Sequence, residues 1–226
     1  LETFSRLLTG TEAIASYCSA NMLKSEQTEK AWQHFLASNE WIFGFGLDYR
    51  FLGILQDEAR LGTSDLAGRG NPSGDFLLGA REFTVLVELK TPDTPLFKRS
   101  SNRAGSWQLS SELVSAVSQI LEQKAQWQVR AQSGNLYDRD GHPIIQKTAD
   151  PKSILVIGGE NAFVSDSPKE REIKLRTFEL FRRDSRNIEI LTFDELYERA
   201  TFIVKHADKD IDLELNLASD DGDVPF

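Results

Sequence analysis

Apolar and polar residues recur with two different periods along the chain, and each period indicates a kind of secondary structure. Apolar residues at helical spacing, every three to four positions, occupy the segments 26–45, 108–131 and 167–184. Short apolar or alternating runs, which are typical of strands, occupy 51–61, 75–79, 83–90, 153–159 and 187–193. A further short helix is expected to begin at Asp194, a residue type that caps helix N-termini. This order of elements predicts an α/β fold, a mixed β-sheet flanked by α-helices.

Turn-forming residues mark the connections between these elements. Gly, Pro, Asn and Ser make 62–74 a loop, and 80–82 is a short turn between two strands. Residues 135–152 are interpreted as a hairpin or a loop. Ser167 and Pro168 stand where a helix N-cap and first turn are expected.

Length and composition are consistent with one main domain. With 226 residues, 40% of them hydrophobic, the chain can close its own core over 1–207, including an N-terminal helical segment at 1–25. An acidic tail follows at 208–226. The alternating Ile and Leu residues of 210–217 predict a strand that covers a sheet edge or joins a subunit interface, and the alternative is a disordered acidic tail. The chain starts at Leu1 rather than Met, so we expect it to be a piece of a longer protein.

The number of cysteines, the spacing of the histidines and the length of the apolar runs exclude several classes of protein. The single cysteine, Cys18, excludes an intramolecular disulfide and is consistent with a reducing compartment. His34, His142 and His206 are far apart in the sequence, which disfavours a zinc site of the usual spacing. No apolar run approaches the ~20 residues that a membrane span needs. We therefore expect a cytoplasmic protein without a membrane partner.

Charge is distributed unevenly along the chain. The net charge of −9 at pH 7 disfavours a polyanionic partner, because nucleic-acid affinity comes largely from Lys and Arg. However, many of the acids lie in 208–223, whereas Lys98, Arg99 and Arg103 form a basic segment of their own. The segment 98–107 is therefore either a phosphate-contacting loop or an ordinary solvated loop.

The stretch "SGDFLLGAREFTVLVELKTP" (73–92) contains the strongest chemical signal in the sequence. Side chains alternate along a strand, so Glu88 and Lys90 point to one side of it and Val87 to the other. If the turn is centred near 81–82, an antiparallel pairing places Asp75 opposite Glu88, with Cβ atoms about 5 Å apart. Two carboxylates at this separation repel each other unless a cation lies between them. Because Mg²⁺ takes carboxylate and phosphate oxygens, the pattern predicts a metal-dependent hydrolysis site with Lys90 beside it.

The Glu/Asp-x-Lys motif on its own is weak evidence. It also occurs at 122–124, 150–152 and 172–174, and the first and last of these lie in predicted helices. Only 88–90 ends a buried strand with an acid expected opposite. The alternative for this pair is an ordinary surface ion pair at a strand end.

Asp75, Glu88 and Lys90 between two helices resemble the PD-(D/E)XK nucleases, which have a restriction-endonuclease-like fold. More narrowly, the chain from about Glu29 to Ala200 is similar to the Shedu family of bacterial anti-phage nucleases. The segments that carry this resemblance are "HFLASNEWIFG", "GDFLL", "VELKTP", "AVSQILEQ", "ILVIGG" and "IEILTFDEL". The resemblance implies a DNA endonuclease that depends on Mg²⁺ or Mn²⁺, acts in phage defence and forms a homo-oligomer.

The same resemblance implies roles for individual residues. Asp75 and Glu88 would be metal ligands and Lys90 the catalytic lysine. An acid on the first helix, Glu29 or Glu40, would complete the metal site. Gln119 corresponds to a glutamine of the following helix, but the tyrosine expected four residues later is replaced by Gln, so the match is partial.

Two other functions are compatible with the sequence. One is an interaction module that keeps the nuclease fold without catalysis, in line with the acidic charge and the unassigned helix acid. The other is hydrolysis of a small phosphorylated substrate at the same site.

Overall fold

A computed structural model describes residues 1–23, 27–44, 53–60, 73–79, 83–102, 105–133, 136–138 and 140–219. A five-stranded sheet in the order β1-β2-β3-β6-β7 forms its centre. The strands of this sheet are β1 (Gly53–Arg60), β2 (Ser73–Gly79), β3 (Phe83–Leu89), β6 (Lys147–Val156) and β7 (Ile188–Leu191). β1, β2 and β3 pair antiparallel, whereas β6 pairs parallel to both β3 and β7. The mixed sheet expected from the sequence is therefore confirmed.

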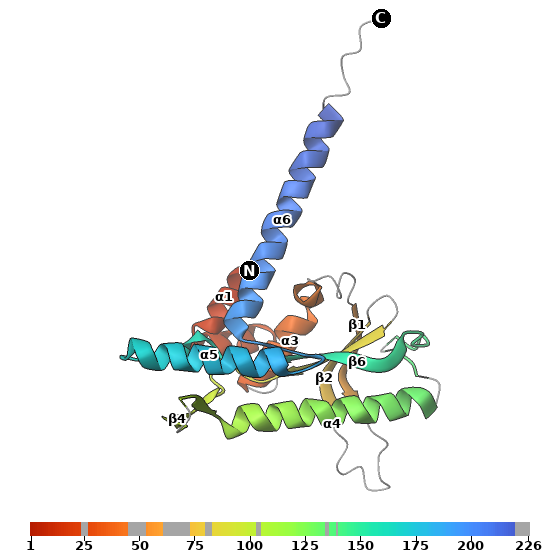
Figure 1. Ribbon diagram of the computed structural model, residues 1–226. Coiled ribbons are helices and arrows are strands. Elements are labelled where there is room, and N and C mark those ends of the chain that lie inside the picture. The colour runs from red at the N-terminus through yellow and green to blue at the C-terminus, as the bar shows by residue number, and fades with distance from the viewer. Residues whose placement is uncertain are drawn as a thin grey trace, which may run out of the picture.

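Helices cover both faces of this sheet (Figure 1). The helices are α1 (Glu2–Leu8), α2 (Thr11–Ala20), α3 (Thr28–Ala37), η1 (Glu40–Phe43), α4 (Ser111–Ser133), η2 (Glu160–Phe163), α5 (Pro168–Asp184) and α6 (Phe193–Ser219). One core contains Trp32 of α3 and Phe193 of α6 against Val87 of β3. On the other face, α4 packs Ile120 and Trp127 in two further clusters. In the described part of the chain, no helix is both long and apolar enough to cross a membrane.

The predicted pairing of β2 with β3 is confirmed at the level of register. Phe76 lies opposite Val87 and Leu78 opposite Val85, which is the pairing that places Asp75 opposite Glu88 one step further on. The predicted turn at 80–82 and most of the predicted loop at 62–74 lie outside the described residues.

The helix predicted at 167–184 is confirmed as α5, and α4 confirms the helix predicted at 108–131. The single helix predicted at 26–45 is instead shorter, with α3 at 28–37 and the separate 3-10 helix η1 at 40–43. Ser167 caps α5 by accepting a hydrogen bond from the Glu170 N–H (3.4 Å), and Pro168 begins the helix. The apolar spacing of 108–131 predicts Ile120 and Leu121 on one helix face, but Ile120 is buried and Leu121 is 48% exposed. Successive helical residues point about 100° apart, so Leu121 lies outside the stripe that faces the sheet.

The C-terminal prediction is wrong. The segment 210–217 is part of α6, which extends away from the rest of the molecule (Figure 1), and is not an edge strand. Its Leu and Glu residues favour helix, and Ile211 is the only β-branched residue within 210–217. The helix cap also differs from the prediction. Thr192, not Asp194, caps α6, because the Glu195 N–H donates to its Oγ1 (3.2 Å) while the Glu195 carboxylate accepts from its N–H (2.9 Å).

A second, two-stranded sheet occupies part of the predicted basic loop. β4 (Phe97–Ser101) pairs antiparallel with β5 (Trp107–Leu109). We refer to these two strands as the β4–β5 ribbon. Of the basic residues expected here, Lys98 and Arg99 lie on β4, while Arg103 lies outside the described residues.

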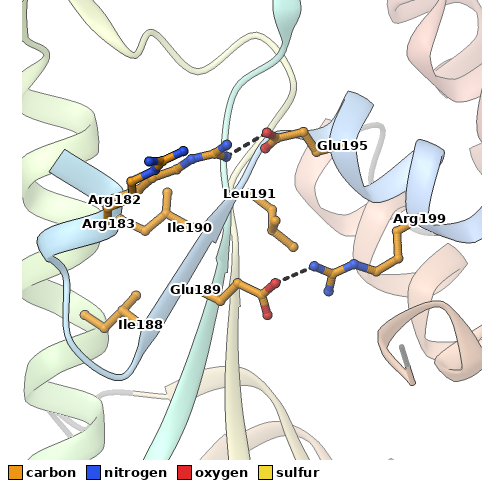
Figure 2. Close-up of a pocket in the computed structure, with 8 residues that line it drawn as sticks. All are labelled: Arg182, Arg183, Ile188, Glu189, Ile190, Leu191, Glu195 and Arg199. Carbon is orange, nitrogen blue, oxygen red and sulfur yellow. Dashed lines mark hydrogen bonds and ion pairs between the residues drawn. The ribbon is translucent and has the colours of Figure 1, made fainter. Parts of the chain in front are cut away.

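Beside the edge strand β7, one ion pair joins α5 to α6 and another joins α6 to β7 (Figure 2). Arg182 of α5 contacts Glu195 of α6 (2.6 Å), and Arg199 of α6 contacts Glu189 of β7. These side chains line an open hollow of about 420 Å³ beside β7. Because its arginines are matched by carboxylates, this hollow has little excess charge.

Candidate active site

Glu88 is the centre of a polar cluster at the end of β3. Its side chain is only 3% exposed and faces α4, whereas Val87 and Leu89 point into the core on the opposite face. The Glu88 Oε1 accepts hydrogen bonds from Lys90 Nζ (2.7 Å) and Gln119 Nε2 (2.6 Å). Its Oε2 accepts from Gln123 Nε2 (2.8 Å). A buried carboxylate is stable only with such partners, so α4 and Lys90 together hold Glu88 in place.

Asp75 is fixed against the same end of β3 from the neighbouring strand. Its Oδ2 accepts a hydrogen bond from the Leu89 N–H (2.6 Å), and its Oδ1 accepts from Gln33 Nε2 of α3. Asp75 therefore joins β2, β3 and α3 at the point where Glu88 and Lys90 also lie.

The structure distinguishes between the two candidate acids of the first helical region. Glu29 of α3 acts electrostatically on both Asp75 and Lys90. The Glu40 carboxylate instead accepts a hydrogen bond from the Ile54 N–H of β1 (2.8 Å). Glu29 is therefore the helix acid next to the cluster, and Glu40 has a structural contact elsewhere.

The chain after Lys90 is held by the loop that follows β6. The Lys90 N–H donates to the Val156 carbonyl (2.8 Å), and the Gly158 N–H donates to the Thr91 carbonyl (3.0 Å). Gly158 has a φ of 68°, and a Cβ there would lie 2.8 Å from the Leu96 side chain. Only glycine fits this close, left-handed position, so the loop fixes the direction in which the chain leaves the site.

Charge repulsion in the cluster is visible in the pKa values of its members. Burial and then the charge of Glu88 raise the pKa of Asp75 to about 7, against the hydrogen bond from the Leu89 N–H. Burial disfavours the Lys90 ammonium, but Glu88, Glu29 and Asp75 more than offset it and raise the Lys90 pKa above its ordinary value. The free site therefore has an excess of carboxylates around one firmly protonated lysine.

Burial of the Asp75 carboxylate, together with the charge of Glu88, predicts that Asp75→Asn stabilises the metal-free protein at alkaline pH. The folded pKa of Asp75 is about 7, whereas an unfolded Asp titrates near 3.9. Between these values the folded state binds more protons, so the free energy of unfolding of the parent falls as pH rises from about 4 to about 7. We expect the variant to gain about 1–3 kcal/mol relative to the parent at pH 8, less than the full pKa difference because Asp75 is partly exposed.

Urea unfolding of both proteins in EDTA at pH 4.5 and pH 8 measures this gain. The two pH values lie below and above the folded pKa of Asp75. All other titratable groups are the same in parent and variant, so their contributions cancel in the difference. If the variant and the parent differ in stability by the same amount at both pH values, the pKa of Asp75 is not raised in the folded protein.

The cluster suits a hard divalent cation in its chemistry, although its acids are more widely spaced than a closed metal site. Carboxylate oxygens are the ligands that Mg²⁺ and Mn²⁺ prefer. A cation would also offset the burial and the Glu88 charge that together raise the Asp75 pKa. Glu29, Asp75 and Glu88 do not bring three oxygens within 4.8 Å of one another. Among the described residues, the one set of three ligand atoms this close together belongs to Asp138, Asp140 and His142, two carboxylate oxygens and an imidazole nitrogen. Asp140 and His142 are exposed.

The compact arrangement around Asp138 has a local structural explanation. Its Oδ1 accepts hydrogen bonds from the backbone N–H groups of His142 (2.7 Å) and Asp140 (2.9 Å), which lower the pKa of Asp138 and close a turn. This turn lies in the segment that the sequence indicates as a hairpin or loop. A single isolated bridge, Tyr137 with Pro143, forms there.

Two site residues, Gln33 and Gln123, were not predicted from the sequence. Gln33 lies one helical turn after Glu29, and Gln123 lies one turn after Gln119, so each shares a helix face with a predicted residue. That i, i+4 spacing is the signal that could have identified them. In the structure Gln123 occupies the place of the expected tyrosine and binds Glu88 directly.

Comparisons with known proteins point to one family. The family model described as "Shedu protein SduA, C-terminal" matches residues 26–197, which is most of the chain. The chain is also similar to the Shedu protein SduA of Bacillus cereus (strain B4264), with 29% identity over 196 residues. That alignment covers 85% of this chain and 49% of the relative, so the chain spans about half the length of the curated relative.

Proposed function

Because the chain belongs to the SduA C-terminal family, we propose that it is the metal-dependent endonuclease part of an anti-phage defence protein. Its site would cleave phosphodiester bonds of phage or foreign DNA in the cytoplasm, within a homo-oligomer. The observation that carries this proposal is the buried Glu88, hydrogen-bonded to Lys90 and adjacent to Asp75 and Glu29. The resemblance to restriction-endonuclease-like folds supports it.

Each residue of the cluster has a proposed role. Asp75 and Glu88 would hold Mg²⁺ or Mn²⁺, with Glu29 as a further ligand after side-chain rearrangement. The ion would supply Lewis-acid stabilisation of the negative charge on a phosphate. Lys90, whose pKa is raised, acts as a cation beside the phosphate and not as a base. Gln119 and Gln123 are positioning residues, because they fix the orientation of the Glu88 carboxylate.

Two observations favour a different function. Glu88 already accepts three hydrogen bonds, and the three acids are not within 4.8 Å of one another. If these hydrogen bonds persist, Glu88 binds no metal, as expected in an interaction module without catalysis. Hydrolysis of a small phosphorylated substrate is the remaining alternative for the same residues.

Nuclease assays of the full-length protein distinguish these functions. Plasmid, linear duplex DNA, single-stranded DNA and RNA are incubated with Mg²⁺, with Mn²⁺ and with EDTA. We expect cleavage of DNA with either metal and none with EDTA. Failure to cleave any of these polymers, together with turnover of a small phosphoester, would favour the small-substrate alternative. The absence of all hydrolysis would favour the interaction module.

A further inference from the structure

The β4–β5 ribbon presents two cations that pair with no acid in the described part of the chain. Lys98 and Arg99 are both exposed on β4. Neither forms an ion pair with a described residue, in contrast to Arg182 and Arg199 beside β7, which both contact carboxylates. The chain has a net charge of −9, so this exposed pair of cations makes the surface locally positive on an otherwise acidic protein.

The ribbon is fixed on helix α5. The Trp107 N–H donates to Thr177 Oγ1 (3.0 Å), and Arg176 donates to the Gly105 carbonyl (3.1 Å). Lys174 lies over the Trp107 ring at 5.0 Å from its centroid. The Trp107 indole N–H also donates to the Lys98 carbonyl (2.7 Å), across the ribbon. These contacts hold the strand that carries Lys98 and Arg99 against α5.

A hollow of about 350 Å³ lies between the ribbon and α5. Its charged lining consists of Lys98, Arg99 and Lys174 together with a single acid, Glu170. Glu170 pairs with Lys174 (2.7 Å), so the charges of Lys98 and Arg99 remain in excess. The hollow therefore suits an anionic group, and its size is sufficient for a phosphate with part of its sugar.

The hollow has a defined position relative to the candidate active site. Ser110 donates through its N–H to the Leu96 carbonyl (3.0 Å) and through its Oγ to the Pro95 carbonyl (2.6 Å), and both residues line the hollow. The same Ser110 hydroxyl accepts from the Leu113 N–H and so caps α4. Gln119, which binds Glu88, follows further along this helix, roughly 13 Å from Ser110 along its axis. That length corresponds to roughly four base pairs of duplex.

We propose that this hollow binds a backbone phosphate of the DNA a few nucleotides away from the bond that the active site cleaves. The inference rests on the proposed function and adds to it a surface that sets the position of the substrate. Contacts to phosphates fix a protein on a duplex without reading its sequence, so this surface contributes affinity and register, not base preference.

Salt-dependent DNA binding by the full-length protein tests the inference. Affinities for a short labelled DNA duplex are measured by fluorescence anisotropy in EDTA between about 50 and 200 mM salt. The test variant is Lys98→Ala with Arg99→Ala. The matched control is Arg183→Ala with Arg186→Ala, which removes the same charge from exposed positions at the far end of α5 and beyond it.

We expect the ribbon variant to bind about tenfold more weakly at the lower salt and to lower the slope of log affinity against log salt by about two. The control should keep the slope of the parent. Lys174→Gln, which leaves β4 unchanged, should give a smaller loss in the same direction. Equal binding by ribbon and control variants, or no DNA binding by the parent, would overturn the inference.

Cleavage assays of the same proteins distinguish failure of this inference from failure of the proposed function. If the parent cleaves DNA and the ribbon variant binds like the control, only the phosphate site is wrong. If binding depends on the ribbon but no DNA is cut, the surface is real and the nuclease assignment is wrong.

Discussion

Lys90→Ala is expected to reduce DNA cleavage about 100- to 1,000-fold while Mg²⁺ still binds, because the lysine stabilises charge on the phosphate and is not a metal ligand. Lys90 lies 2.7 Å from Glu88 Oε1, so its removal takes a positive charge away from the carboxylates. Metal affinity should therefore stay the same or increase. Cleavage rates and calorimetric Mg²⁺ titration of the full-length variant measure the two effects separately.

The chain contains a matched control for Lys90. Lys124 ends another Glu-x-Lys sequence, at 122–124, but lies on α4 and pairs with Asp150 (2.6 Å). Lys124→Ala removes the same side chain from the same motif and should leave cleavage unchanged. Loss of cleavage in both variants, or loss of Mg²⁺ binding in Lys90→Ala, would contradict the role given to Lys90.

Trp127→Ala is expected to lower the free energy of unfolding by about 3–5 kcal/mol, the largest stability effect that we predict. Trp127 is 1% exposed and packs with Leu77 and Leu86 between α4 and the sheet. Its indole N–H also donates to Thr84 Oγ1 (2.9 Å), and Thr84 is fully buried. Removing the ring therefore opens a cavity and leaves a buried hydroxyl without its donor. Urea unfolding measures the loss.

Two other tryptophan variants separate the loss of the hydrogen bond from the loss of packing in Trp127→Ala. Trp127→Phe keeps most of the apolar surface and loses the hydrogen bond, so we expect a cost of about 1–2 kcal/mol. Trp41 is 37% exposed, so Trp41→Ala should cost less than about 1 kcal/mol. If Trp127→Ala costs no more than Trp41→Ala, the packing between α4 and the sheet is not as described.

The sequence predicts the fold well where the spacing of apolar residues and the position of a turn indicate the same strand pairing. The β2–β3 register follows from the position of one turn, because side chains alternate strictly along a strand. The 210–217 segment shows the limit of this reasoning. Four apolar residues in alternation fit a strand, but helix-favouring residues without Gly or Pro continue α6 through them. The β4–β5 ribbon was missed because its polar strands carry no apolar period.

The site residues on strands that are neighbours in the sequence could be predicted. Those whose position depends on how a helix packs against the sheet could not. Asp75, Glu88 and Lys90 follow from two adjacent strands, and Gln119 from the resemblance. The choice of Glu29 over Glu40 requires the orientation of α3, which brings Gln33 onto Asp75 and leaves Glu40 to β1. The partners of Glu88 on α4 likewise depend on how that helix lies across the sheet.

The most direct test of the central claim is the plasmid-cleavage rate of Glu88→Gln beside the parent in Mg²⁺, in the full-length protein. Gln is nearly the same size as Glu and can still accept a hydrogen bond from Gln123, so the thermal unfolding midpoint should confirm a folded variant. We predict that the parent cuts DNA and that the variant loses at least about 1,000-fold of that rate, since a ligand for the metal is gone. A folded Glu88→Gln variant that cuts DNA as fast as the parent would contradict the assignment of the active site to the end of β3.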